Sequence, residues 1–104
     1  MKKIDLEQIP AREIVPGYSV KLVHSEFMSV AYWDIKAGAL MPEHSHLHEQ
    51  IANLIEGEFE LTVAGETQVL KPGSIVIIPP DVRHSGKALK DTRMIDVFYP
   101  TRKI

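Results

Sequence analysis

GALMPEHSHLHEQIANLIEG, at residues 38–57, contains three of the five histidines of the chain within five positions. Residues i and i+2 of an extended segment project to one face, so the imidazoles of His44 and His46 can reach the same point. Gln50 has the same parity and adds an amide oxygen to that face. The spacing therefore predicts half of a metal site, with two nitrogen donors and one oxygen donor.

A second stretch, GSIVIIPPDVRH at residues 73–84, supplies the remaining donor. Its prolines end an apolar run and place His84 just beyond a strand. The chain has no cysteine, so only nitrogen and oxygen donors are available. We expect His44, His46, Gln50 and His84 to hold one divalent transition metal ion, with ordinary surface histidines as the alternative. Imidazole suits Ni, Zn, Fe and Mn alike, which leaves the identity of the metal open.

Outward from these stretches, the chain breaks into short apolar or alternating runs separated by Gly, Pro, Asn and Asp, a pattern typical of short strands. An all-β fold is the prediction, with strands at residues 18–24, 27–35, 50–55, 59–63, 67–70, 74–78 and 93–99. Ala64-Gly65-Glu66 predicts a hairpin turn, and helical spacing is confined to residues 4–9, before Pro10. Such strands must close on themselves or pair as two sheets, which gives a sandwich or a double-sheet jelly roll.

Length, charge and hydropathy narrow the class of protein. A single core usually takes about 100 to 150 residues, so 104 residues predict one domain, with an N-terminal arm at 1–17 and a barrel at 18–104. The formal net charge of −2 provides no field that would attract nucleic acid or an anionic membrane. Acidic residues interrupt the N-terminus, and no run of about 20 apolar residues occurs. We therefore expect a cytoplasmic location.

The C-terminal run at residues 93–99 presents two largely apolar faces. Alternation sends residues 94, 96 and 98 to one face and residues 95, 97 and 99 to the other. A carboxylate on a buried face is costly unless it pairs or acts, so Asp96 is a functional candidate if its face lines the barrel. The reversed orientation, with Asp96 at the surface, is the alternative. The outer apolar face needs cover from the margin of the other sheet or from a partner subunit, and a homodimer is the expected assembly.

The stretches 38–57 and 73–84 resemble, in this order, the two sequence motifs of the cupin superfamily, and most closely its small single-domain members. The resemblance implies a double-stranded β-helix, the jelly-roll barrel of cupins, and it implies metal ligation by His44, His46 and His84. Gln50 stands where an acidic ligand is usual, as in a subgroup with Gln at that position. Asp81 stands where the second motif more often has Gly. Both motifs and the intervening hairpin cover residues 38–84.

The tail DVFYPTR, residues 96–102, is similar to that of small cupins associated with pectin degradation. Those proteins convert a 4,5-unsaturated uronic acid, the monomer that polysaccharide lyases leave, into its linear keto form. The resemblance implies that Asp96 moves protons, that Arg102 grips the substrate carboxylate through its planar fork and that Phe98 shapes the pocket wall. A metal-dependent isomerising enzyme acting on a sugar acid is the expected function. A frayed, solvated terminus is the alternative for Arg102.

Two other functions fit the same fold, because one scaffold hosts many activities. A metal-dependent dioxygenase would need redox-active iron with open coordination positions. A non-catalytic protein would bind a sugar or another small ligand without turnover. His48 and Glu49 become alternative ligands if the strand is bulged; otherwise Glu49 faces away and His48 supports the site through a hydrogen bond. His24 is interpreted as structural or solvent-facing.

Overall fold

Ten strands and one short helical turn form the protein, whose computed structural model describes residues 1–104. After a 3-10 turn, η1 (Leu6–Gln8), the strands are β1 (Arg12–Val15), β2 (Tyr18–His24), β3 (Ser29–Ile35), β4 (Leu40–His44), β5 (Glu49–Glu56), β6 (Phe59–Val63), β7 (Glu66–Leu70), β8 (Ile75–Ile78), β9 (His84–Ala88) and β10 (Thr92–Tyr99). No helix has the length and apolar character that crossing a membrane requires.

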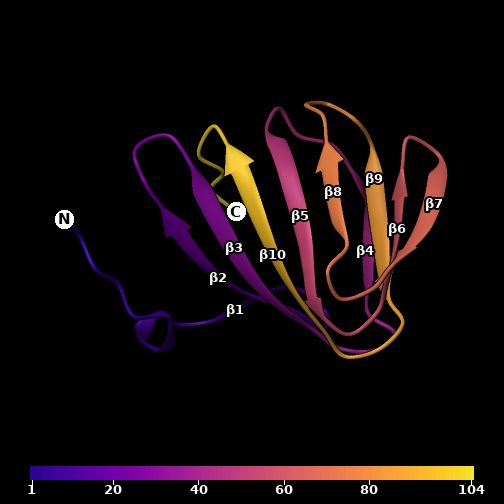
Figure 1. Cartoon of the computed structure of the whole chain (residues 1–104), viewed down its shortest axis with the longest axis horizontal. Helices are drawn as coiled ribbons and strands as arrows, with labels where there is room; N and C mark the ends of the chain where they lie inside the picture. Colours follow the sequence, from indigo (N-terminus) through magenta and orange to yellow (C-terminus); the bar gives the residue numbers. More distant parts are fainter.

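The strands pair into two antiparallel sheets (Figure 1). The larger sheet has six strands in the order β1-β2-β3-β10-β5-β8, and the smaller has four in the order β4-β9-β6-β7. The last strand, β10, lies between β3 and β5, so the C-terminal run occupies the middle of the larger sheet. This arrangement confirms the double-sheet jelly roll that the strand pattern and the two motifs predict.

Alternating side chains build the core between the sheets. In β10, Met94, Asp96 and Phe98 are buried, while Ile95 and Val97 lie half-buried on the outer face. The neighbouring strands β3 and β5 follow the same period of two. A single cluster of 14 buried apolar residues results. The predicted inward face of the C-terminal strand is therefore confirmed, and the reversed orientation is wrong.

Three strands lie outside the predicted set, namely β1, β4 and β9. β1 pairs with β2, so the larger sheet begins within the segment expected to be an N-terminal arm, upstream of residue 18. β4 contains Pro42, which has no N–H to donate, and its pairing with β9 shifts register between Met41 and His44. β9 contains Gly86, a residue that is uncommon in strands. Short strands that depend on pairing with other segments show only a weak pattern in their own sequence.

Two local predictions can be compared directly with the structure. The hairpin at residues 64–66 is confirmed between β6 and β7. Ala64 and Gly65 have φ angles of 49° and 81°, and positive values at both positions match the twist of a two-residue hairpin turn. The helical spacing at residues 4–9 yields only the three-residue turn η1, which ends before Pro10.

Candidate metal centre

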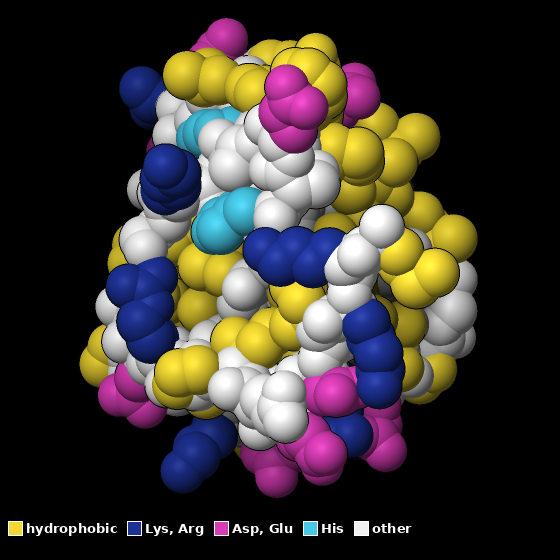
Figure 2. Space-filling view, turned by 90° about the vertical axis from the view of Figure 1, so that its left-hand side faces the viewer, with side chains coloured by type: hydrophobic (Ala, Val, Ile, Leu, Met, Phe, Trp, Pro, Cys, Tyr) yellow, Lys and Arg dark blue, Asp and Glu magenta, His cyan; other side chains and the backbone are white.

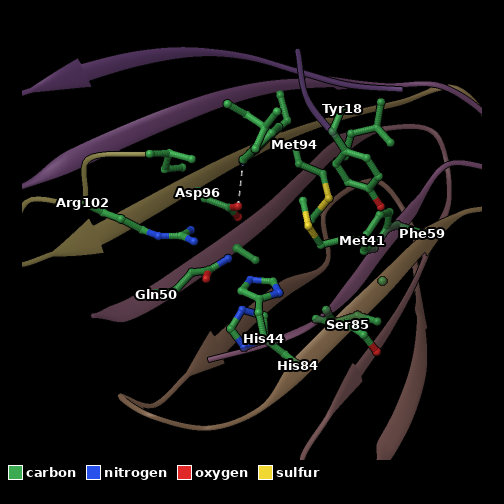
Figure 3. A pocket seen from close by; sticks show the side chains of 17 residues that line it. Tyr18, Met41, His44, Gln50, Phe59, His84, Ser85, Met94, Asp96 and Arg102 are labelled. Carbon is green, nitrogen blue, oxygen red and sulfur yellow. Dashed lines mark hydrogen bonds between the residues drawn. The ribbon is translucent and has the colours of Figure 1, made fainter. Parts of the chain in front are cut away.

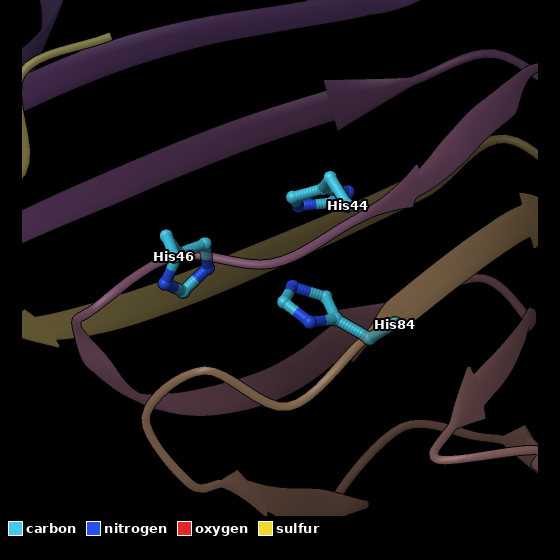
Figure 4. A group of neighbouring side chains, drawn as sticks. All are labelled: His44, His46 and His84. Carbon is cyan, nitrogen blue, oxygen red and sulfur yellow. The ribbon is translucent and has the colours of Figure 1, made fainter.

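Two strands of the smaller sheet bring the predicted histidines together. His44 ends β4 and His84 begins β9, and the two are register partners. His46 lies in the irregular segment between β4 and β5, so this segment and not strand parity directs its ring. The ring centres are 4.2 Å apart for His44 and His84, 5.0 Å for His46 and His84, and 5.8 Å for His44 and His46. One nitrogen of each ring lies within 4.8 Å of the others (Figure 4).

Hydrogen bonds fix which nitrogen of each ring carries the proton. Each Nδ1 contacts a backbone carbonyl oxygen, at 2.9 Å for His44, 3.1 Å for His46 and 2.9 Å for His84. A carbonyl oxygen only accepts, so Nδ1 carries the hydrogen and Nε2 keeps its lone pair. Nε2 of His46 is buried without a partner. The three rings are therefore oriented as metal-ligating histidines are, with the second nitrogen held by a carbonyl.

Burial keeps the rings of His46 and His84 neutral. Burial, and then the positive charges of Arg102 and the neighbouring histidines, lower the pKa of His46 to about 4. Burial also lowers the pKa of His84, against the opposing effect of the Val82 carbonyl. Neutral imidazole is the form that ligates a metal, since a protonated ring has no lone pair to give.

Gln50, the fourth predicted donor, is buried on β5. Only 6% of its surface is exposed, and its Oε1 atom has no hydrogen-bond partner. It lines the same cavity as His44 and His84 (Figure 3). A buried amide oxygen without a partner is costly, and a cation would satisfy this oxygen together with the ring nitrogens. The residues present fit a divalent transition metal ion held by His44, His46, His84 and Gln50.

Asp96 points into the same cavity from the middle of β10. Its register partners on the two adjacent strands are Ala31 and Ala52, whose small buried side chains leave room for a carboxyl group. The indole Nε1 of Trp33 donates to Oδ2 at 3.0 Å, whereas Oδ1 is buried without a partner. One oxygen is thus fixed by the protein and the other faces the cavity unpaired.

The pKa of this carboxyl is shifted toward neutrality. Burial raises the pKa of Asp96 from 3.8 to about 6. The side chains of Gln50 and Trp33, followed by the charge of Arg102, act in the opposite direction and lower it. Desolvation is the larger effect because it disfavours the ionised form. The carboxyl can therefore exist in both protonation states near neutral pH.

The C-terminal tail carries Arg102 to the cavity and is held in place. The backbone N–H of Arg102 donates to Ser29 Oγ at 2.9 Å, and His48 Nε2 donates to the Thr101 carbonyl at 3.2 Å. The guanidinium carbon lies 4.9 Å from the centre of the Phe98 ring. Burial lowers the pKa of Arg102 and the nearby carboxylate raises it. The alternative of a frayed, solvated terminus is wrong, because these contacts anchor the tail.

Two residues near the site follow the expectation, and two others have no signal in the sequence that would identify them. His48 supports the tail through its ring, and its backbone carbonyl accepts the hydrogen bond of the His46 ring. Glu49 is exposed, as expected from its parity. The Trp33 indole and the Ser29 hydroxyl were not predicted, since both contacts join residues more than 60 positions apart. Their only local signal is the period-two alternation of β3, which turns both side chains inward.

The candidate residues surround one cavity of about 280 Å³ between the sheets. Figure 2 shows one face of the molecule on which histidine side chains, basic side chains and recessed hydrophobic side chains lie together. Of the predicted site residues, His44, Gln50, His84, Asp96 and Arg102 line this cavity. His46 and Phe98 are not among the residues that line it, and their ring centres lie 5.8 Å apart.

The chain is similar in sequence and in structure to known proteins. The chain is 28% identical over 99 residues to the pectin degradation protein KdgF of Dickeya dadantii (strain 3937), covering 92% of this chain and 90% of that protein. It is 27% identical over 94 residues to the H2HPP isomerase of Bacillus subtilis, covering 88% of this chain and 40% of that protein. The solved structure of KdgF from Halomonas sp. superposes with a TM-score of 0.87 at 29% identity, covering 93% of this chain and 91% of that one.

A family comparison covers both motifs. Residues 31–98 match the family model Cupin_2, described as a cupin domain. The matched segment contains all four predicted metal donors and the catalytic candidate Asp96. Because this match spans more than half of the chain, the protein belongs to the cupin family.

Proposed function

We propose that the protein is a metal-dependent isomerase that converts a 4,5-unsaturated uronic acid into its linear keto form. The observation that carries the proposal is the buried Asp96 carboxyl, which shares one cavity with His44, His84 and Arg102. The names of two relatives support the class of reaction, since one is a pectin degradation protein and the other an isomerase.

The metal would be held by His44, His46, His84 and Gln50, and Ni, Zn, Fe and Mn all suit these donors. When bound, such an ion supplies a Lewis acid that polarises a substrate oxygen. Three neutral imidazoles and one amide bring no negative charge, so the ligands leave the charge of the ion uncompensated. That charge would favour an oxygen-rich anionic substrate.

Asp96 would move the protons of the isomerisation. The reaction requires that the hydroxyl proton at C1 leaves, that the bond between C1 and the ring oxygen breaks, and that C4 gains a proton, so the composition is unchanged. A carboxyl with a pKa of about 6 can accept and return a proton near neutral pH. Trp33 orients one oxygen at 3.0 Å and leaves the other free for the substrate.

Arg102 would bind the substrate carboxylate. It takes part in none of the ion pairs of the chain, so its guanidinium is free to accept an anionic ligand. A planar guanidinium can donate two parallel hydrogen bonds to a carboxylate. Phe98, buried beneath the guanidinium, would form the wall that fixes its plane.

The substitution Asp96→Asn tests this function. It keeps the size and a polar oxygen for Trp33 but removes the titrating group, so we expect loss of turnover with the metal content unchanged. Turnover is followed as the loss of ultraviolet absorbance of the substrate double bond, and metal content by elemental analysis.

Asp34→Asn is the matched control, because Asp34 is an exposed aspartate on β3 outside the cavity. This variant is expected to consume the unsaturated uronate at the wild-type rate. Consumption by Asp96→Asn at the same rate would show that Asp96 has no part in the reaction.

A further inference from the structure

The cavity has two chemically different ends (Figure 3). At one end lie the polar groups of the proposed reaction, Arg102, Asp96 and Gln50, with the histidines beside them. The cavity continues past the histidines between apolar side chains, of which Figure 3 labels Met41, Met94, Tyr18 and Phe59. Ten of the 17 lining residues are hydrophobic. A ligand held by Arg102 therefore has an apolar space next to it.

The apolar end offers few free hydrogen-bonding groups. The Tyr18 hydroxyl donates to the Ala39 carbonyl at 3.3 Å, and the Trp33 indole donates to Asp96. The Ser85 hydroxyl points away from the methionines in Figure 3. A ligand hydroxyl placed among these side chains would lose its water without gaining a partner, which costs free energy. This end therefore disfavours a hydroxylated group and favours a hydrocarbon.

Size and shape agree with a compact occupant. The whole cavity measures about 280 Å³, and an apolar cavity of about 150 Å³ is enough to hold benzene. Met41 on β4 and Met94 on β10 line this end of the cavity from the two different sheets. Methionine side chains are flexible and make favourable contacts with aromatic rings, so they can close around a flat group.

We propose that the apolar end of the cavity is a subsite for the compact hydrocarbon group, such as an aromatic ring, of a carboxylate ligand. Arg102 holds the carboxylate of this ligand, and this assignment of Arg102 rests on the proposed function. The subsite extends the ligands of the protein beyond sugar acids to small acids with one apolar ring. Binding of such an acid requires no turnover.

Trp33 provides a direct readout. It is the single tryptophan of the chain and lines the cavity, so its fluorescence reports occupancy. The probes are 3-phenylpropanoate and propanoate, which share the carboxylate and differ in the ring. We expect 3-phenylpropanoate to bind the metal-loaded protein at least about tenfold more tightly, since hydrophobic pockets discriminate by about tenfold or more per missing group.

The substitution Met41→Gln places an amide in the apolar end at nearly constant size. It is expected to weaken 3-phenylpropanoate binding by about tenfold and to leave propanoate binding unchanged. Met28→Gln is the matched control, because Met28 is an exposed methionine outside the cavity. Thermal unfolding of both variants shows whether each is folded.

Two results would overturn the subsite. One is equal affinity for 3-phenylpropanoate and propanoate, and the other is equal 3-phenylpropanoate affinity in folded Met41→Gln and Met28→Gln. Failure of the uronate assay leaves this comparison untouched, because fluorescence binding does not depend on catalysis. Conversely, turnover of the uronate with no preference for the ring would support the proposed function and refute the subsite.

Discussion

The guanidinium carbon of Arg102 lies 4.9 Å from the centre of the Phe98 ring, so the tail stacks on β10, one of the two central strands of the larger sheet. Phe98 is fully buried, and the Arg102 backbone is fixed by Ser29. Arg102 is the one arginine or lysine that lines the cavity. The contact gives a residue near the end of the chain a defined position in the candidate site.

Replacement of Arg102 by Lys tests that position. Lysine keeps the positive charge but loses the planar fork and the stacking on Phe98. A hydrogen bond to a charged group contributes about 1.5 to 3 kcal/mol, so we expect kcat/KM for the uronate to fall by about tenfold to a hundredfold, mainly through KM. Arg93→Lys, at an exposed arginine outside the cavity, is the control. Equal kinetics of the two variants would refute the carboxylate clamp.

The raised pKa of Asp96 predicts a dependence of stability on pH. The folded protein binds this proton more tightly than the unfolded chain, because the pKa rises from 3.8 to about 6 on folding. Protonation of Asp96 adds about 3 kcal/mol to the free energy of unfolding below about pH 4, and this contribution is lost as the pH rises through 6. Asp96→Asn has no such proton to lose, so its free energy of unfolding should rise relative to that of the wild type between pH 4 and 7.

Urea unfolding of chelator-treated protein across this pH range measures the difference. The pKa values of His46 and His84 are lowered on folding, which has the opposite effect on stability, but both rings are common to the two proteins and their effects cancel. A stability difference that does not change between pH 4 and 7 would show that the Asp96 pKa is ordinary.

The outer face of the larger sheet predicts a homodimer. Ile75 and Ile77 on the edge strand β8 are 66% exposed, and Ile51 and Ile55 continue the apolar surface on β5. Exposed apolar patches of this kind usually mark a contact surface. We expect Ile77→Glu to convert a dimer into a monomer by light scattering, whereas Leu40→Glu, on the other sheet, leaves it intact. A monomeric wild-type protein would refute this assembly.

Much of the site could be predicted because its residues carry local signals. The spacing of His44 and His46 and the proline frame before His84 are visible in short windows. The alternation around Asp96 identified two possible faces, and the resemblance of the tail favoured the correct one. These features depend on period and residue type, which the sequence contains directly.

The rest depends on contacts between distant segments. β4 and β9 are short strands with a proline and a glycine, and they exist because they pair with each other. The hydrogen bond from Trp33 to Asp96 spans 63 positions and has no local pattern. His46 lies in an irregular segment between β4 and β5, where the strand parity that predicts its direction does not apply. Such contacts follow from tertiary packing, which a single sequence does not display.

Elemental analysis of the untagged protein shows whether His44, His46, His84 and Gln50 bind one metal ion. We expect about one equivalent of a divalent transition metal per wild-type chain, almost none in His84→Ala, and the wild-type content in His24→Ala, whose ring bonds to Ser29 outside the cavity. Equal metal content in His84→Ala and His24→Ala, or a metal-free wild type after supply of all four metals, would show that these residues do not form a metal site.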